Sequence, residues 1–204
     1  MFPLGSVLFP YDVLPLHVFE PRYRLMTRRV LEGDKEFGVV LIERGQEVGG
    51  GDVRSEHGTI ARVVQVTEAP DGRYGLVTVG VRRIEVVEWL PDDPYPRAEV
   101  RALDDPPATA ADDDARERVV AALTRVTEIA RRIDPRVAAP PPLDPDPLRA
   151  SYEAAALAPI GSYDAQRVLA ATDATTRLAL LETLLSERAE EFEARLGDDD
   201  NGQG

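Results

Sequence analysis

The sequence contains no cysteine, which excludes disulfides, thiolate metal ligands and a cysteine nucleophile. Its apolar runs are short, and none reaches the roughly 18 residues that a membrane-spanning helix needs. No basic segment followed by an apolar one marks a signal peptide at the N-terminus. These absences predict a cytoplasmic protein that does not interact with membranes.

Lysine is nearly absent as well, since Lys35 is the single lysine against 23 arginines. A P-loop needs a lysine at the end of a glycine-rich loop, followed by Ser or Thr, whereas Lys35 stands between Asp34 and Glu36. A Ser–Lys dyad needs a desolvated lysine as its base, and this acidic turn keeps Lys35 solvated and charged. We therefore expect neither ATP hydrolysis nor Ser–Lys peptidase chemistry.

Histidine is scarce too, with only His17 and His57. His17 alternates with apolar residues in a predicted strand, so we expect a structural histidine at the edge of the core. His57 is expected in an exposed loop before a strand. Two histidines about 40 residues apart, without an acidic cluster beside them, do not indicate a zinc site. We predict no catalytic, cofactor-binding or metal-binding residues.

The net charge of −13 is unevenly distributed, at −3 for residues 1–103 and −10 for residues 104–204. Neither part carries the basic stripe that a nucleic-acid backbone requires, so nucleic-acid binding is not expected. Four arginines lie on or beside the first predicted helix. They form either a site for an anion or acidic peptide or, as we favour, a solvated basic face offset by the acidic residues that follow. They are Arg22, Arg24, Arg28 and Arg29.

The first half of the chain is typical of a small barrel or sandwich with one helix. Pro21 starts a short amphipathic helix that ends near Leu31. Gly49–Gly51 predicts a flexible loop, and turns are expected at 70–72 and at Gly80. Short apolar or alternating segments predict six strands, at 13–19, 37–42, 59–67, 74–79, 84–90 and 98–103.

The second half changes to helical periodicity. Residues 104–114 are expected to form an acidic, proline-containing linker, and Asp114 to cap a helix over 116–133. A proline-rich loop at 135–147 separates this helix from others at 148–158, at 162–171 and from Asp173 or Thr172 to Gly197. The predicted class is α+β, with subdomains 1–103 and 115–196 and a disordered tail at 197–204.

Several segments, taken in order, resemble the Lon substrate-binding domain, the N-terminal module of ATP-dependent Lon proteases. The resemblance covers nearly all of residues 1–196 and implies a PUA-like β pseudo-barrel with a short capping helix, followed by a C-terminal α-helical bundle. The chain ends where the Lon ATPase would begin, so it resembles a stand-alone copy without the ATPase and peptidase domains. The segments are FPLGSVLFPYDVLPLHVFEPRYRLM, FGVVLIERGQEVGG, HGTIARVVQV, GRYGLVTVGVRRIEV and YEAAALAPIGSYDAQRVLAATDATTRLALLETLL.

This resemblance implies a non-catalytic module that binds unfolded or tagged polypeptides, alone or with a partner protease or ATPase, and needs no cofactor. We expect its binding surface in a cleft between the two subdomains. The alternatives are a small-molecule hydrolase on a PUA-like scaffold and, less favoured, an RNA-binding protein. The oligomeric state is left open. The candidate peptide-binding residues are Tyr11, Phe19, Tyr23, Tyr74, Arg22 and Arg24.

Overall fold

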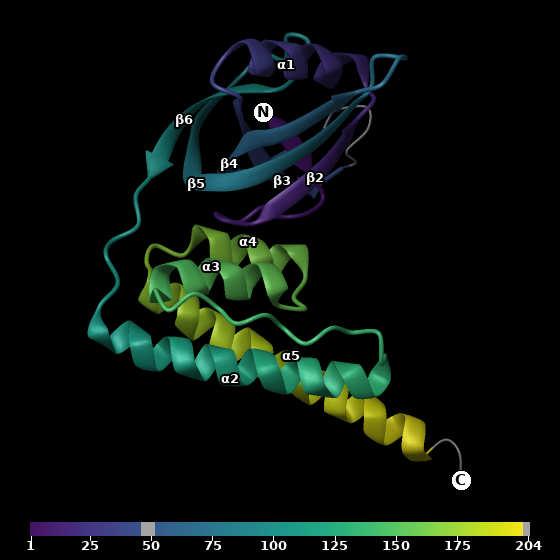
Figure 1. Ribbon diagram of the computed structural model, residues 1–204. Coiled ribbons are helices and arrows are strands. Elements are labelled where there is room, and N and C mark those ends of the chain that lie inside the picture. The colour runs from purple at the N-terminus through teal and green to yellow at the C-terminus, as the bar shows by residue number, and fades with distance from the viewer. Residues whose placement is uncertain (46–51, 202–204) are drawn as a thin grey trace. The chain divides into compact units, whose positions relative to one another are not determined.

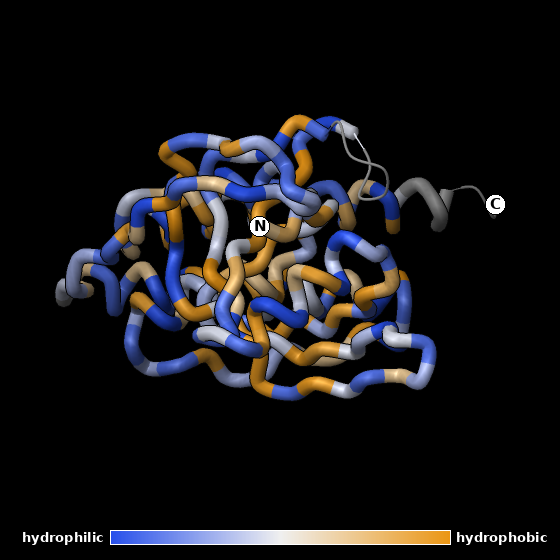
Figure 2. Tube along the Cα trace, turned by 90° about the horizontal axis from the view of Figure 1, so that it is seen from above, coloured by the Kyte–Doolittle hydropathy of each residue, from blue (hydrophilic) through white to orange (hydrophobic). Residues whose placement is uncertain are grey.

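The computed structural model describes residues 1–45 and 52–201 and contains two compact units, Met1–Asp104 and Asp105–Gly204 (Figure 1). Within these described ranges, unit 1 holds a six-stranded sheet and one helix, and unit 2 holds four helices. The predicted α+β class is therefore confirmed. The predicted loop at Gly49–Gly51 lies outside the described residues. Along the trace, hydrophobic and hydrophilic residues alternate over short distances, as amphipathic elements require (Figure 2).

The sheet of unit 1 is ordered β1-β3-β4-β5-β2, and β6 also pairs with β5. The pairing of β1 with β3 is parallel, and all the other pairs are antiparallel. Within the described residues, β1 and β2 end the sheet, and each has one edge without a strand partner. The strands are β1 (Phe2–Leu4), β2 (Val13–Val18), β3 (Glu36–Arg44), β4 (Val53–Glu68), β5 (Tyr74–Leu90) and β6 (Arg97–Leu103).

The strand β5 runs without interruption through Gly80, where the sequence predicted a turn between two strands. Glycine is needed here because a Cβ atom at this position would overlap the carbonyl oxygen of Phe9. The close approach is held by hydrogen bonds from the Tyr11 amide to the Gly80 carbonyl (2.8 Å) and from the Gly80 amide to the Asp12 carbonyl (2.9 Å). Gly80 therefore lets a second segment pack on the strand and does not reverse its direction.

Both histidines also differ from expectation. The strand β4 starts at Val53, earlier than predicted, so His57 lies within the strand and not in a loop before it. His17 is exposed on β2 and does not sit at the edge of the core, because alternation turns the neighbouring Leu16 and Val18 inward instead.

The helix α1 (Pro21–Glu32) starts at Pro21 as predicted and lies across one end of the sheet (Figure 1). Glu20 precedes it in an extended conformation and places a carboxylate near the positive end of the helix dipole. The helix buries Tyr23 and Met26 against the core of unit 1. That core includes side chains from β1, β2, β3, β4 and β5, among them Phe2, Leu4, Val18, Phe37 and Leu76.

Unit 2 consists of α2 (Ala110–Ile133), α3 (Pro147–Leu157), α4 (Ser162–Ala170) and α5 (Ala174–Asn201). The helix α2 begins inside the predicted linker, because Thr109 and Asp112 form a capping box in place of the predicted Asp114 cap. The Thr109 amide donates to the Asp112 carboxylate over 2.6 Å. Asp173 caps α5, as one of the two predicted alternatives, by accepting from the amide of Thr176 (2.7 Å).

The end of α5 also differs from expectation. The helix passes through Gly197 and continues to Asn201, so Gly197 does not end it and the part of the tail up to residue 201 is helical. Gly197 is not among the glycines with a positive φ, so it does not adopt the left-handed conformation of a helix end. Residues 202–204 lie outside the described chain.

A buried polar network ties α3 and α5 to the start of unit 2. Arg177 is fully buried (0% exposed) and donates to the Asp105 carboxylate and to the Ser151 hydroxyl, each over 2.9 Å. Its guanidinium lies 3.9 Å from the ring centroid of Tyr152, whose hydroxyl donates to Asp105 over 2.6 Å. Around this network, apolar stripes of α2 and α5 fill the core, as their periodicity predicted: Val119, Leu123, Val126, Leu178, Leu181 and Leu185.

Candidate functional site

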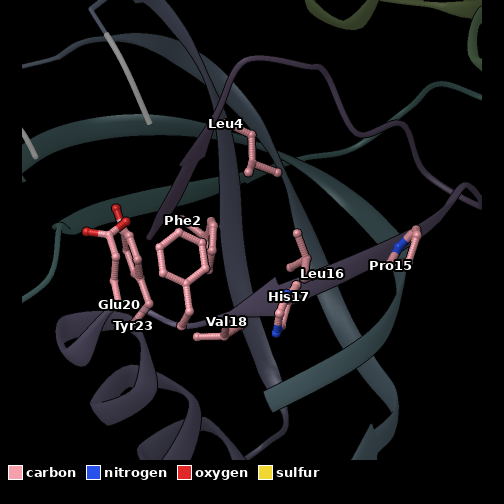
Figure 3. Close-up of a pocket in the computed structure, with 9 residues that line it drawn as sticks. Phe2, Leu4, Pro15, Leu16, His17, Val18, Glu20 and Tyr23 are labelled. Carbon is pink, nitrogen blue, oxygen red and sulfur yellow. The ribbon is translucent and has the colours of Figure 1, made fainter. Parts of the chain in front are cut away.

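Unit 1 contains a pocket of about 160 Å³ between the free edges of β1 and β2, closed on one side by the start of α1 (Figure 3). In the described residues the strand order begins at β1 and finishes at β2, and the pocket lies where residues of these two strands come together. Two residues come from β1, and the others come from β2, from the segment leading into α1 and, with Tyr23, from the first turn of α1. The lining residues are Phe2, Leu4, Pro15, Leu16, His17, Val18, Phe19, Glu20 and Tyr23.

An aromatic stack forms one wall of the pocket. The rings of Phe2 and Tyr23 stack with centroids 4.3 Å apart and an interplanar angle of 22° (Figure 3). Phe37 lies behind Phe2, with ring centroids 6.0 Å apart. Because these three side chains are held in the core of unit 1, the wall exists before any ligand arrives.

The rim of the pocket is partly polar. Phe19 is 51% exposed, and its ring meets that of His17 edge-on at 6.2 Å. The Glu20 carboxylate lies beside Tyr23 and accepts a hydrogen bond from Arg22 Nε over 3.1 Å (Figure 3). The Arg22 guanidinium lies 4.5 Å from the ring centroid of Tyr23. Mostly apolar walls with a few placed polar groups are typical of a binding site.

We expect the Tyr23 hydroxyl to ionise only at strongly alkaline pH. Burial raises the pKa of Tyr23 to about 12, and the neighbouring Arg22 offsets part of this effect. The folded state then holds a proton that the unfolded chain releases near its ordinary pKa of 10, so stability is lost as the pH rises from 10 towards 12. The phenolate absorbance of the native chain minus that of Tyr23→Phe should titrate near pH 12. A difference curve centred near pH 10 would contradict this.

The structure brings together three of the six predicted binding residues. Phe19 and Tyr23 line the pocket, and Arg22 lies against Tyr23. The binding roles assigned to all six residues stay predictions.

The other three predicted residues do not line the pocket. Tyr74 is buried in the core, where its hydroxyl donates to Glu68 over 3.1 Å. Tyr11 is 45% exposed and lies beside Gly80. The Arg24 side chain points to the β4–β5 turn, since its guanidinium lies where a Cβ of Gly72 would be.

Sequence reasoning missed the contribution of Phe2 and Leu4. The three residues of β1 were too few to be predicted as a strand, although the apolar run around Pro3 gave a signal. They pair with Val39 and Leu41 of β3, and Phe2 stacks on Tyr23 of α1. The predicted cleft between the two units stays a prediction.

Within the described parts of the chain, no three His, Asp or Glu residues gather closely enough to hold a metal ion. Across the same residues, no helix combines the length and apolar character needed to cross a bilayer. A second hollow, of about 220 Å³, lies between α2 and α5 and is lined by Ala121, Ala122, Arg125, Leu185, Ser186 and Ala189.

Comparisons with known proteins give a consistent result. The family model described as the ATP-dependent protease La (LON) substrate-binding domain matches residues 1–187. Lon protease 2 of Myxococcus xanthus is 35% identical over 103 residues, covering 50% of this chain and 12% of that protein. Lon protease 1 of Herpetosiphon aurantiacus is 25% identical over 193 residues, covering 90% of this chain and 23% of that protein. The chain thus spans less than a quarter of either relative.

A solved structure agrees with these matches. The Lon N-terminal domain protein from Xanthomonas campestris superposes with a TM-score of 0.64 at 25% identity. The superposition covers 88% of this chain and 94% of that one, so it includes both units.

Proposed function

The chain belongs to the family of ATP-dependent protease La (LON) substrate-binding domains, and from this premise we propose that it is a polypeptide-binding module whose binding site is the β1–β2 pocket. In this proposal the ligand is an exposed apolar segment of an unfolded or tagged polypeptide. The module acts by binding alone, and any degradation of the bound chain belongs to a partner protease or ATPase.

The single observation that carries the proposal is a preformed, partly open apolar pocket with an exposed aromatic ring at its rim. Its volume of about 160 Å³ is close to that of an engineered cavity, about 150 Å³, that binds benzene. The pocket therefore has room for one apolar side chain. Phe19, at 51% exposure, supplies apolar surface at the rim that would become buried when a segment binds.

The edges of β1 and β2 favour insertion of a ligand side chain into the pocket over addition of the ligand to the sheet as an extra strand. Pro3 stands in β1 and Pro15 in β2, so each of the two free edges lacks one backbone donor. Proline on an edge strand blunts its tendency to pair with another strand. The proposal accordingly places the binding energy in the pocket and its rim.

We expect Phe19→Ala to weaken binding of an unfolded polypeptide about tenfold, because truncating an aromatic anchor removes on the order of 1.4 kcal/mol or more. The fold should persist, since the ring is half exposed. The measurement is the amount of an unfolded test protein that the immobilised chain retains. The test protein is a disulfide-containing protein that has been reduced and alkylated so that it cannot refold, and its native form is the reference.

The matched control is Tyr163→Ala, which removes an aromatic ring that is 75% exposed on α4 of unit 2. It should leave binding unchanged. Equal loss in both variants, or no loss in Phe19→Ala, would place the binding surface elsewhere. Salt-sensitive retention of RNA in place of the unfolded protein would contradict polypeptide binding itself.

A further inference from the structure

The pocket wall already holds one cation, and it comes from the chain itself. Arg22 donates from Nε to the Glu20 carboxylate over 3.1 Å, and its guanidinium lies 4.5 Å from the centroid of Tyr23. A carboxylate beside an aromatic face is the environment that a guanidinium prefers when partly removed from water. Arg22 therefore shows that this part of the pocket has the chemistry to hold a basic side chain.

The charges around the pocket favour a basic ligand. Glu20 lines the pocket, and its side chain is 18% exposed, so its charge is only partly screened by water. Among the described residues, neither arginine nor lysine is part of the lining. Residues 1–103, which contain the pocket, carry a net charge of only −3, so the bias against an acidic segment comes from the Glu20 carboxylate in the lining.

We propose, resting on the proposed function, that the pocket selects polypeptide segments in which an apolar side chain is accompanied by an arginine or lysine. The apolar side chain enters between β1 and β2, and the cation binds at Glu20 and Tyr23. Arg22 occupies this cation position in the free protein, and the ligand's basic side chain displaces it. Arg22 is thus an internal competitor that sets a threshold for binding.

Competition makes opposite predictions for the two charged residues. Removing Glu20 takes away the acceptor, so basic segments should bind less tightly. Removing Arg22 frees both the Glu20 carboxylate and the face of Tyr23, and it deletes none of the lining side chains, so basic segments should bind more tightly. A purely structural ion pair would not separate the two variants in this way.

The test uses three short fluorescent peptides that share a central phenylalanine and differ at the next position, which is arginine, citrulline or glutamate. Citrulline keeps the shape of arginine and loses its charge. The native chain should bind the arginine peptide about tenfold more tightly than the citrulline peptide, because a hydrogen bond between two charged groups is stronger than one between a neutral donor and a carboxylate. The glutamate peptide should bind least.

Four variants complete the experiment. Glu20→Gln should abolish the preference for arginine over citrulline, while Glu56→Gln, which changes an exposed carboxylate of β4 away from the pocket lining, should keep it. Arg22→Ala should strengthen binding of the arginine peptide about threefold. Arg22→Gln should do the same and keeps a polar side chain if the alanine variant loses structure.

The outcomes separate this inference from the proposed function. Equal binding of the arginine and citrulline peptides overturns the inference while the pocket remains a binding site for apolar segments. Weaker binding after loss of Arg22 also overturns it, because Arg22 would then contact the ligand directly. If none of the three peptides binds the native chain, the proposed function fails and the inference fails with it.

Discussion

Replacing Arg177 by methionine should destabilise unit 2 by about 3–5 kcal/mol, the usual result of removing one partner of a buried ion pair. Methionine fills most of the volume but leaves the Asp105 carboxylate and the Ser151 hydroxyl without the donor that now meets each of them over 2.9 Å. It also removes the cation stacked on Tyr152. The guanidinium and the Ser151 hydroxyl are both 0% exposed, so the hydroxyl would lose this donor in a place shielded from bulk water.

Two optical probes follow the stability of the two units separately. The only tryptophan, Trp89, lies on β5 in unit 1, so its fluorescence follows the sheet, whereas far-ultraviolet circular dichroism is dominated by the helices of unit 2. Urea unfolding of Arg177→Met should show an earlier helical transition. The control is Arg167→Met, which breaks an exposed pair with Asp164 (2.8 Å) and should change stability by less than about 0.5 kcal/mol. Equal shifts in both variants would show that Arg177 does not hold unit 2 together.

Local patterns in the sequence predicted the class of the fold and most of its elements. Alternation identified β2, and Pro21 marked the first turn of α1 because a proline there loses no intrahelical hydrogen bond. The apolar spacing of α2 and α5 located the core of unit 2. In each case the information lies within one element, where the period of the side chains is set by the backbone geometry.

Features that depend on distant partners were not predictable in the same way. Asp112 belongs to an acidic run that suggests a solvated linker, yet it is 1% exposed. Its carboxylate accepts from the amide of Thr109 and from the hydroxyl of Thr175, 63 residues away on α5. These hydrogen bonds lower the pKa of Asp112 against the opposing effect of burial, and they let α2 start before Asp114. Only the folded unit reveals the second partner.

The candidate site was only partly predictable, because it combines local sequence features with contacts between distant segments. Phe19 and Tyr23 were predicted as aromatic residues near the expected cleft, and both line the pocket. Tyr74 was selected by the same criterion but is 4% exposed in the core, because residue type does not reveal which face of a strand points inward. The pocket itself arises from the pairing of β1 with β3, a contact between segments more than 30 residues apart. No local pattern encodes that gap.

Gly80→Ala should destabilise unit 1 by about 3 kcal/mol, at the upper end of the cost of overpacking. The added methyl group would overlap the carbonyl oxygen of Phe9 and would lie 2.9 Å from its carbonyl carbon. These are backbone atoms, so the clash cannot be relieved by turning a side chain. Relief requires the segment before β2 to move away, which breaks the paired hydrogen bonds that Gly80 makes with Tyr11 and Asp12.

The same strand provides a matched control at Gly75, where an added Cβ would meet nothing closer than the Thr67 Cβ at 4.0 Å. Gly75→Ala should be neutral or stabilising by up to about 1 kcal/mol, because alanine restricts the unfolded chain more than glycine does. Trp89 fluorescence during urea unfolding measures both variants. Since the displaced segment leads directly into β2, Gly80→Ala should also weaken binding at the β1–β2 pocket, whereas Gly75→Ala should preserve it. Similar stability of the two variants would mean that the close approach of the Phe9 backbone does not require glycine at position 80.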